Sequence, residues 1–152
     1  MDREEGPLST TPVPDEIRRE VTIGVEREQV WAALTEPDQL RRWFPTKDAR
    51  VDLRPGGEIY LEWDEVSATG IFDEIDPPNR LAYRWHPGGD EYPSTTVEFT
   101  LADAADGTGT RLTVVERGFA QLPAQNRADN VEGWTSELKE LVEYLTTLKT
   151  RH

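Results

Sequence analysis

The sequence predicts an α+β domain in which a curved, seven-stranded antiparallel sheet wraps around one long C-terminal helix. Seven short segments alternate apolar with polar residues, which is the period of strands with one buried face. Most of these segments are separated by a few turn-forming residues, so consecutive strands should pair antiparallel. Near the C-terminus the apolar residues recur at spacings of three and four, which is typical of an amphipathic helix.

The N-terminal elements are one strand followed by two short helices. Residues 1–15 combine three prolines with acidic and hydroxyl residues, so we expect a disordered leader before a domain over 16–150. Residues 17–25 alternate as a strand, and residues 26–34 change to helical spacing. A second short helix, capped by Asp38, is predicted over 40–44 and ends at Pro45.

Six further strands and the long helix follow. We expect the strands over residues 49–53, 59–63, 70–75, 81–85, 95–101 and 112–116, and the helix over 131–148. Glu137 falls among the polar residues of that helix, and Gly133 suggests a close approach of its backbone to the sheet. One helix covers only part of the apolar face of a seven-stranded sheet, so the sheet must curl around it. Space left between the two would form a ligand pocket.

Composition narrows the classes of function. With 36% hydrophobic residues and no long apolar run in 152 residues, we expect a cytoplasmic protein. The net charge of −13 disfavours nucleic acid and membrane as partners. The absence of cysteine and the presence of only two histidines, His86 and His152, leave no expected metal site or cofactor. Gly56-Gly57 and Gly88-Gly89 are turn glycines and not phosphate-binding loops.

Aromatic residues at inward positions are the candidate ligand contacts. Each ring buries about 150–250 Å², and a pocket rimmed by several rings would favour a planar apolar guest. The alternative is that the rings simply fill the core. The candidate pocket residues are Trp43, Trp63, Phe72, Trp85, Phe99, Glu116, Trp134 and Leu138.

Glu116 is the one acidic residue on an apolar strand face, in register with Leu112 and Val114. One interpretation makes it a polar anchor or general base inside the pocket. The other, which we favour at this stage, is that the end of the strand emerges into solvent. Glu62 and Glu98 fall on the opposite face, so no facing pair of acids for glycoside hydrolysis is predicted.

Five segments together resemble a known superfamily. The segment VWAALTEPDQLRRWF at 30–44 resembles the opening signature of the START-like (SRPBCC) superfamily, and the family similar to activators of heat-shock protein 90 ATPase matches best. The agreement continues at 55–59, 70–85, 109–114 and 133–138. The resemblance implies a helix-grip fold with a hydrophobic cavity. It implies no single activity, because relatives include lipid carriers, polyketide cyclases, drug-sequestering proteins and chaperone cofactors.

Three hypotheses about function follow. The leading one is a non-catalytic module that binds a small hydrophobic or aromatic molecule, since no catalytic constellation is visible in the sequence. The second is a protein-interaction role, such as assisting a chaperone ATPase, in which the acidic surface meets a basic partner. The third is a cyclase or hydrolase that uses Glu116 as a base.

Overall fold

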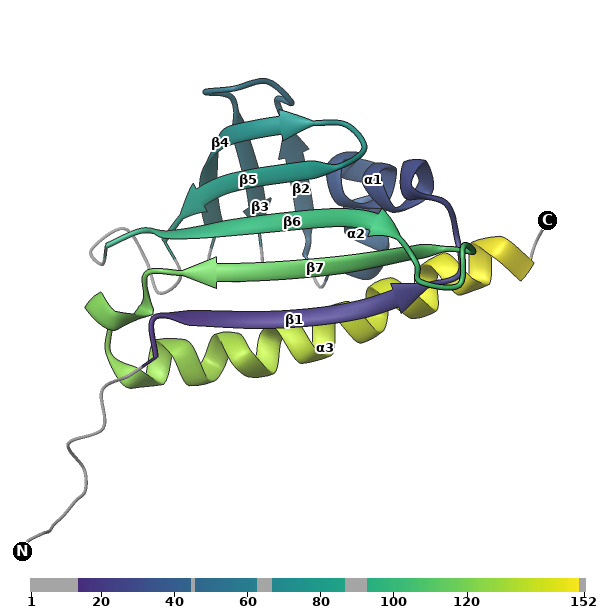
Figure 1. Cartoon of the computed structure of the whole chain (residues 1–152). Helices are drawn as coiled ribbons and strands as arrows, with labels where there is room; N and C mark the ends of the chain where they lie inside the picture. Colours follow the sequence, from purple (N-terminus) through teal and green to yellow (C-terminus); the bar gives the residue numbers. More distant parts are fainter. Residues whose placement is uncertain (1–13, 45, 63–66, 87–92, 151–152) are drawn as a thin grey trace, which may run out of the picture.

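The protein is one curved antiparallel sheet with a long helix lying across its concave face (Figure 1). The computed structural model describes residues 14–44, 46–62, 67–86 and 93–150, so most of the predicted leader and Trp63 lie outside the described residues. The strand order is β1-β7-β6-β5-β4-β3-β2. The strands are β1 (Glu16–Ile23), β2 (Asp48–Val51), β3 (Glu58–Glu62), β4 (Ser67–Asp76), β5 (Arg80–Trp85), β6 (Thr95–Asp103) and β7 (Thr110–Arg117). This confirms the predicted fold class.

The helices differ from the prediction mainly at their ends. They are α1 (Arg27–Thr35), α2 (Pro37–Trp43), the 3₁₀ turn η2 (Phe119–Gln121) and α3 (Ala124–Thr150). The predicted Asp38 cap is wrong, because α2 already begins at Pro37 and its N-cap, Glu36, makes no side-chain capping bond. Proline suits a first helical position, since its fixed φ fits the helix and its missing N–H has no partner there anyway. Helix α3 begins several residues before the predicted start.

The inner sheet face and α3 enclose the core. Along β6 and β7 every second residue is buried, and Trp134, Leu138, Leu141 and Leu145 of α3 are buried opposite them. Helices α1 and α2 cover the far end of the same face, beside the C-terminal half of α3 (Figure 1). Among the described helices, none combines the length and the apolar composition that a membrane crossing requires.

The expected close approach at Gly133 is wrong. A methyl group built on Gly133 would meet only the Glu137 Oε2 atom, at 3.9 Å, and no atom of the sheet within 4 Å. The larger side chains of α3, such as Trp134 and Leu138, hold the helix backbone away from the strands. The glycine is therefore not required by packing.

The outer sheet face carries a ladder of alternating charges across five strands. Glu74, Arg80, Glu98, Arg117 and Glu16 follow one another from β4 to β1, with Arg80 Nε 3.0 Å from Glu74 Oε1 and Arg117 Nε 3.4 Å from Glu16 Oε1. Burial opposes ionisation of Glu98, but Arg117 and then Arg80 hold the pKa of this carboxyl below its ordinary value. Each exposed pair contributes less than about 1 kcal/mol, so the main effect is a face of balanced charge.

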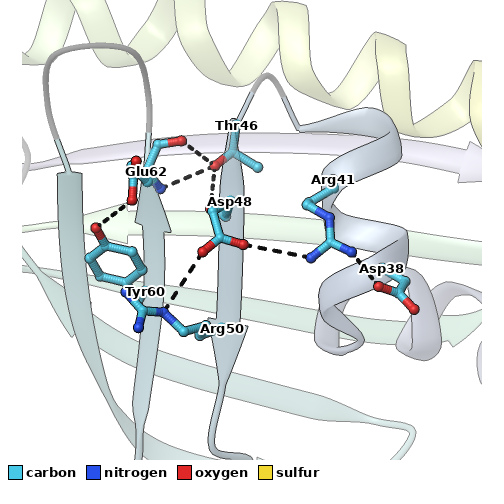
Figure 2. A network of polar contacts seen from close by, with 7 residues as sticks. All are labelled: Asp38, Arg41, Thr46, Asp48, Arg50, Tyr60 and Glu62. Carbon is cyan, nitrogen blue, oxygen red and sulfur yellow. Dashed lines mark hydrogen bonds and ion pairs between the residues drawn. The ribbon is translucent and has the colours of Figure 1, made fainter.

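A second polar network fastens the edge strand β2 to α2 and β3 (Figure 2). The Thr46 hydroxyl lies 2.6 Å from the Asp48 carbonyl oxygen and accepts a hydrogen bond from the Glu62 backbone N–H. The Tyr60 hydroxyl donates to the Glu62 carboxylate at 2.9 Å, and Arg41 of α2 lies 3.7 Å from Asp48. These charges and the neighbouring helix discourage the addition of a further strand at this edge.

Candidate functional site

Glu116 lies inside the protein, fully buried at 0% exposure. The favoured interpretation, that this strand end emerges into solvent, is therefore wrong. After Arg117 the chain turns through η2, whose Phe119 is also 0% exposed, and α3 then runs back beneath the strand. The turn and the start of the helix cover the strand end, so water does not reach the carboxylate.

Four side chains donate hydrogen bonds to this carboxylate. Oε1 accepts from Asn130 Nδ2 at 3.0 Å and from Trp134 Nε1 at 2.8 Å. Oε2 accepts from Trp85 Nε1 at 3.2 Å and from the Thr95 hydroxyl. The donors come from β5, β6 and α3, so the carboxylate on β7 joins four elements. Hydrogen bonds to an ionised group are stronger than neutral ones, and together they offset the cost of burying the charge.

The strand register explains why these groups meet. Glu116 lies opposite Val97 on β6, and Thr95 lies opposite Trp85 on β5, so the inward side chains of three neighbouring strands converge at one end of the sheet. Because both oxygens of Glu116 already accept two hydrogen bonds each, its lone pairs are occupied. The arrangement suits a structural clamp better than a general base.

The charge of Glu116 acts on two further polar groups, which have no partners among the described residues. Tyr83 is 3% exposed, and burial, followed by the charges of Glu116 and Glu137, raises its pKa well above the ordinary value. Glu137 is half-buried, and burial, followed by the charge of Glu116, raises its pKa to about 7. Neither the Tyr83 hydroxyl nor the Glu137 carboxyl forms a hydrogen bond or ion pair with the described residues.

We refer to Tyr83, Trp85, Thr95, Glu116, Asn130, Trp134 and Glu137 together as the Glu116 cluster. Within the described part of the chain, Arg127 Nε is the one side-chain nitrogen or oxygen that is completely enclosed and lacks a partner. The Tyr83 oxygen also lacks a partner but is not completely enclosed, so packing does not seal it. Buried polar groups normally have partners. The Tyr83 hydroxyl and the Glu137 carboxyl, whose charge acts on Tyr83, can therefore exchange hydrogen bonds with a guest.

Aromatic rings surround the cluster. The Tyr83 ring lies edge-on to Phe72 at 6.0 Å and to Trp85 at 5.5 Å between ring centroids. Phe99 lies 6.2 Å from Tyr83 and 5.8 Å from Trp134, which connects the sheet rings to the helix. Such edge-to-face pairs are favourable arrangements of aromatic side chains. The cluster is thus a group of polar atoms in a largely aromatic wall.

The structure brings most of the predicted pocket residues together, whereas Trp43 lies apart from them. Phe72, Trp85, Phe99, Glu116 and Trp134 are connected by the contacts above, and Leu138 is buried one turn beyond Trp134.

Trp43 lies elsewhere, in the corner between α1 and α2. Its indole N–H donates to the Ala33 carbonyl at 2.8 Å. Helix α2 reaches α3 at Tyr144, whose hydroxyl donates to Gln39 at 3.1 Å. Tyr144 lies ten residues after Trp134, about 15 Å along a helix.

Sequence reasoning did not include four members of the cluster, namely Tyr83, Thr95, Asn130 and Glu137. A signal was present for two of them, because Asn130, Trp134 and Glu137 follow one another at spacings of four and three and so share one helix face. Glu137 was instead grouped with the solvent-facing acids. Among the residues that the structure describes, no three His, Cys, Asp or Glu side chains are grouped as metal ligands would be.

The chain matches the model of one known protein family over most of its length. The family model described as Activator of Hsp90 ATPase homolog 1-like protein matches residues 25–146. A search of curated proteins finds no match to this chain.

Solved structures give matches over most of the chain. Protein NE0264 from Nitrosomonas europaea is 28% identical, with 90% of this chain and 97% of that chain covered at a TM-score of 0.71. DynU16, a protein in the dynemicin biosynthetic locus, is 26% identical over 88% of this chain at a TM-score of 0.76, and this chain spans 48% of its length. PFC0360w, an HSP90 activator from Plasmodium falciparum, is 22% identical, covers 84% of this chain and 94% of its own, and has a TM-score of 0.69. At that identity the last likeness shows the fold alone.

Proposed function

Because the chain belongs to the Activator of Hsp90 ATPase homolog 1-like family, a family on a fold that serves several activities, we propose its function from its own interior. We propose that it binds a small, largely aromatic molecule between the inner sheet face and α3. The observation that carries the proposal is the Glu116 cluster, where the Tyr83 hydroxyl and the Glu137 carboxyl lack partners inside an aromatic wall.

The energetics favour a guest at this position. A buried polar group without a hydrogen bond costs about 1–3 kcal/mol, and the Tyr83 hydroxyl, on a residue that is 3% exposed, is such a group. A bound molecule that supplies partners to Tyr83 and Glu137 recovers this cost, and its rings extend the aromatic wall. The similarity to DynU16, a protein in a biosynthetic locus, is in keeping with a small-molecule role.

Indole resonances offer a direct test. Trp85 and Trp134 donate their indole N–H groups to Glu116, whereas Trp43 donates to Ala33 in the α1–α2 corner. In ¹⁵N-labelled protein titrated with a panel of aromatic compounds, we expect a true ligand to shift the Trp85 and Trp134 indole signals and to leave that of Trp43 in place.

Matched variants separate binding in the interior from binding elsewhere. Trp134→Phe should abolish the ligand-induced change in tryptophan fluorescence or weaken binding, whereas Trp43→Phe should retain both. Absence of any response across a broad panel, or shifts confined to Trp43, would contradict the proposal.

A protein partner, such as a chaperone ATPase, is the second candidate. The family description favours it, and the exposed face of α3 carries Asp129, Glu132, Glu140 and Glu143 with Lys139 as the basic residue among them. An acidic helix face would suit a basic surface on a partner. Stimulation of chaperone ATPase turnover that is lost in a Glu132→Lys, Glu140→Lys variant would support this role, and unchanged turnover at saturating protein would reject it.

An enzyme that uses Glu116 as a base is the third candidate. It is less favoured because four donors already occupy the carboxylate. Where a turnover is found, equal rates in the wild type and in Glu116→Gln would dismiss that role.

A further inference from the structure

The inference below rests on the proposed ligand-binding function and concerns the chemistry of the ligand. We propose that the ligand carries a basic amine next to its aromatic rings, and that the Glu116 cluster holds the ammonium group between the Glu137 carboxylate and the Tyr83 hydroxyl. The aromatic faces of the cluster would then lie around the cation and the rings of the ligand. A neutral or acidic aromatic molecule would fit the same wall less well.

The charges around the cluster are not balanced. Two carboxyl groups, on β7 and α3, lie close enough for the charge of Glu116 to act on Glu137. Every donor to Glu116 is a neutral side chain. Among the charged groups of the described residues, none that is basic acts on Glu137 or on Tyr83. Within the described residues, the site therefore has an excess of negative charge and no basic side chain that acts on Glu137 or Tyr83.

Two basic side chains on neighbouring elements, Arg127 and Arg19, are engaged elsewhere. Arg127 of α3 donates through Nη2 to the Glu16 carbonyl at 3.0 Å, at the start of β1. Arg19 of β1 donates to the Arg18 carbonyl at 2.9 Å. Neither forms an ion pair with Glu116 or Glu137 in the described structure. A cationic group on the ligand would supply a compensating positive charge.

An amine fits the free groups of the cluster better than an alcohol or an acid does. An ammonium group donates to the Glu137 carboxylate and to the Tyr83 oxygen, and charge-assisted bonds of this kind are the stronger ones. Aromatic faces attract cations through their negative quadrupole, and Phe72, Tyr83, Trp85, Phe99 and Trp134 supply such faces. A hydroxyl group would use the hydrogen bonds but not the charge. A carboxylate ligand would add a third negative charge beside two existing ones.

The arrangement predicts a characteristic pH dependence. Among the described residues, the charged group that acts on Glu137 is Glu116 on β7, and Glu137 in turn acts on the Tyr83 hydroxyl of β5. With a pKa of about 7 in the free protein, Glu137 is mostly protonated at pH 6 and mostly ionised at pH 8. An amine with a high pKa remains a cation over this range. Its affinity should therefore rise about tenfold from pH 6 to pH 8, in proportion to the ionised fraction of Glu137.

Three matched probes test the proposal. The probes are 1-naphthylmethylamine, 1-naphthylmethanol and 1-naphthoic acid, which share one ring system and differ in the polar group. We expect the amine to bind most tightly at pH 8, by about tenfold over the alcohol, with the difference shrinking at pH 6. Glu137→Gln should remove both the pH dependence and the preference for the amine, while the alcohol still binds.

The outcomes separate failure of the inference from failure of the proposed function. If the alcohol or the acid binds as tightly as the amine, or if the preference survives in Glu137→Gln, the amine is wrong and the binding function stands. If none of the three probes shifts the Trp85 and Trp134 indole signals at millimolar concentration, the amine inference is overturned, and the same silence across the broad aromatic panel overturns the binding function as well. Circular dichroism checks that Glu137→Gln folds, which we expect because its carboxyl is half-buried and makes no hydrogen bond with the described residues.

Discussion

Replacing Glu116 by glutamine tests whether the buried carboxylate holds the sheet and α3 together. An amide offers one oxygen and one NH₂ group in place of two oxygens. If the NH₂ group replaces Oε2, the Thr95 hydroxyl can rotate to accept from it, but the Trp85 indole loses its acceptor. If the NH₂ group replaces Oε1, the Asn130 amide can flip to accept from it, but the Trp134 indole N–H loses its acceptor. An indole donates only, so either orientation leaves one buried N–H unpaired.

The expected cost follows from that count. An unpaired buried donor costs about 1–3 kcal/mol. The glutamine also loses the charge-assisted hydrogen bonds of the carboxylate, but because the amide is neutral and costs less to bury, part of that loss is offset. We therefore expect Glu116→Gln to lower the free energy of unfolding by about 1–3 kcal/mol, or Tm by about 2–12 °C for a chain of this size. The shift in urea midpoint at unchanged m-value measures it.

Glu20→Gln serves as the matched control. Glu20 lies on the outer face of β1, half exposed and 3.7 Å from Arg111, so its loss should change stability by less than about 0.5 kcal/mol. A Glu116→Gln variant as stable as this control would refute the role of the carboxylate as a clamp. In a double-mutant cycle, Trp134→Phe should cost less in the glutamine background than in the wild type.

Three further predictions concern the helix and its acid. Gly133→Ala should raise the free energy of unfolding by about 0.5–1 kcal/mol, since its methyl group meets only Glu137 Oε2 at 3.9 Å; a destabilised variant in urea melts would contradict this. The Glu137 pKa of about 7 lies above the ordinary 4.5, so the folded state holds a proton that the unfolded state releases. The stabilisation that protonated Glu137 gives to the folded state is fully present below about pH 4.5 and is lost as the pH rises through about 7, with a total change of at most about 3 kcal/mol. The difference in unfolding free energy between the wild type and Glu137→Gln should follow that curve. Removing the charge of Glu116 by Glu116→Gln should lower the pKa of Glu137, measured by NMR titration of its side-chain carboxyl; an unchanged value would show that burial alone sets it.

The fold could be predicted because its signals are local. Alternation in β6 and β7 and the three-and-four spacing from Trp134 to Leu145 each report a single buried face. The end of a strand is less predictable, because what covers it comes from a distant part of the chain. The solvent exposure of Glu116 depends on η2 and α3, which lie outside its own strand.

The candidate site was predicted only in part for the same reason. Phe72, Trp85, Phe99 and Trp134 were found because inward register identifies them. Tyr83 was not among the predicted pocket residues, since the strand pattern does not show which ring lies near a carboxyl. Glu137 was assigned to the solvent-facing acids because the burial of a charged residue at the boundary of a helix face depends on what packs across the interface.

The strand order has a consequence for how the chain reaches this state. β1 is the first strand of the sheet to be synthesised, but it pairs with β7, the last one. Glu16 therefore cannot pair with Arg117 until β7 has been synthesised. Contacts so distant along the chain form slowly because a large loop must close first. During synthesis, β1 therefore remains an unpaired strand until most of the remaining sheet has been made. In that interval a chaperone that covers β1 would protect it from aggregation.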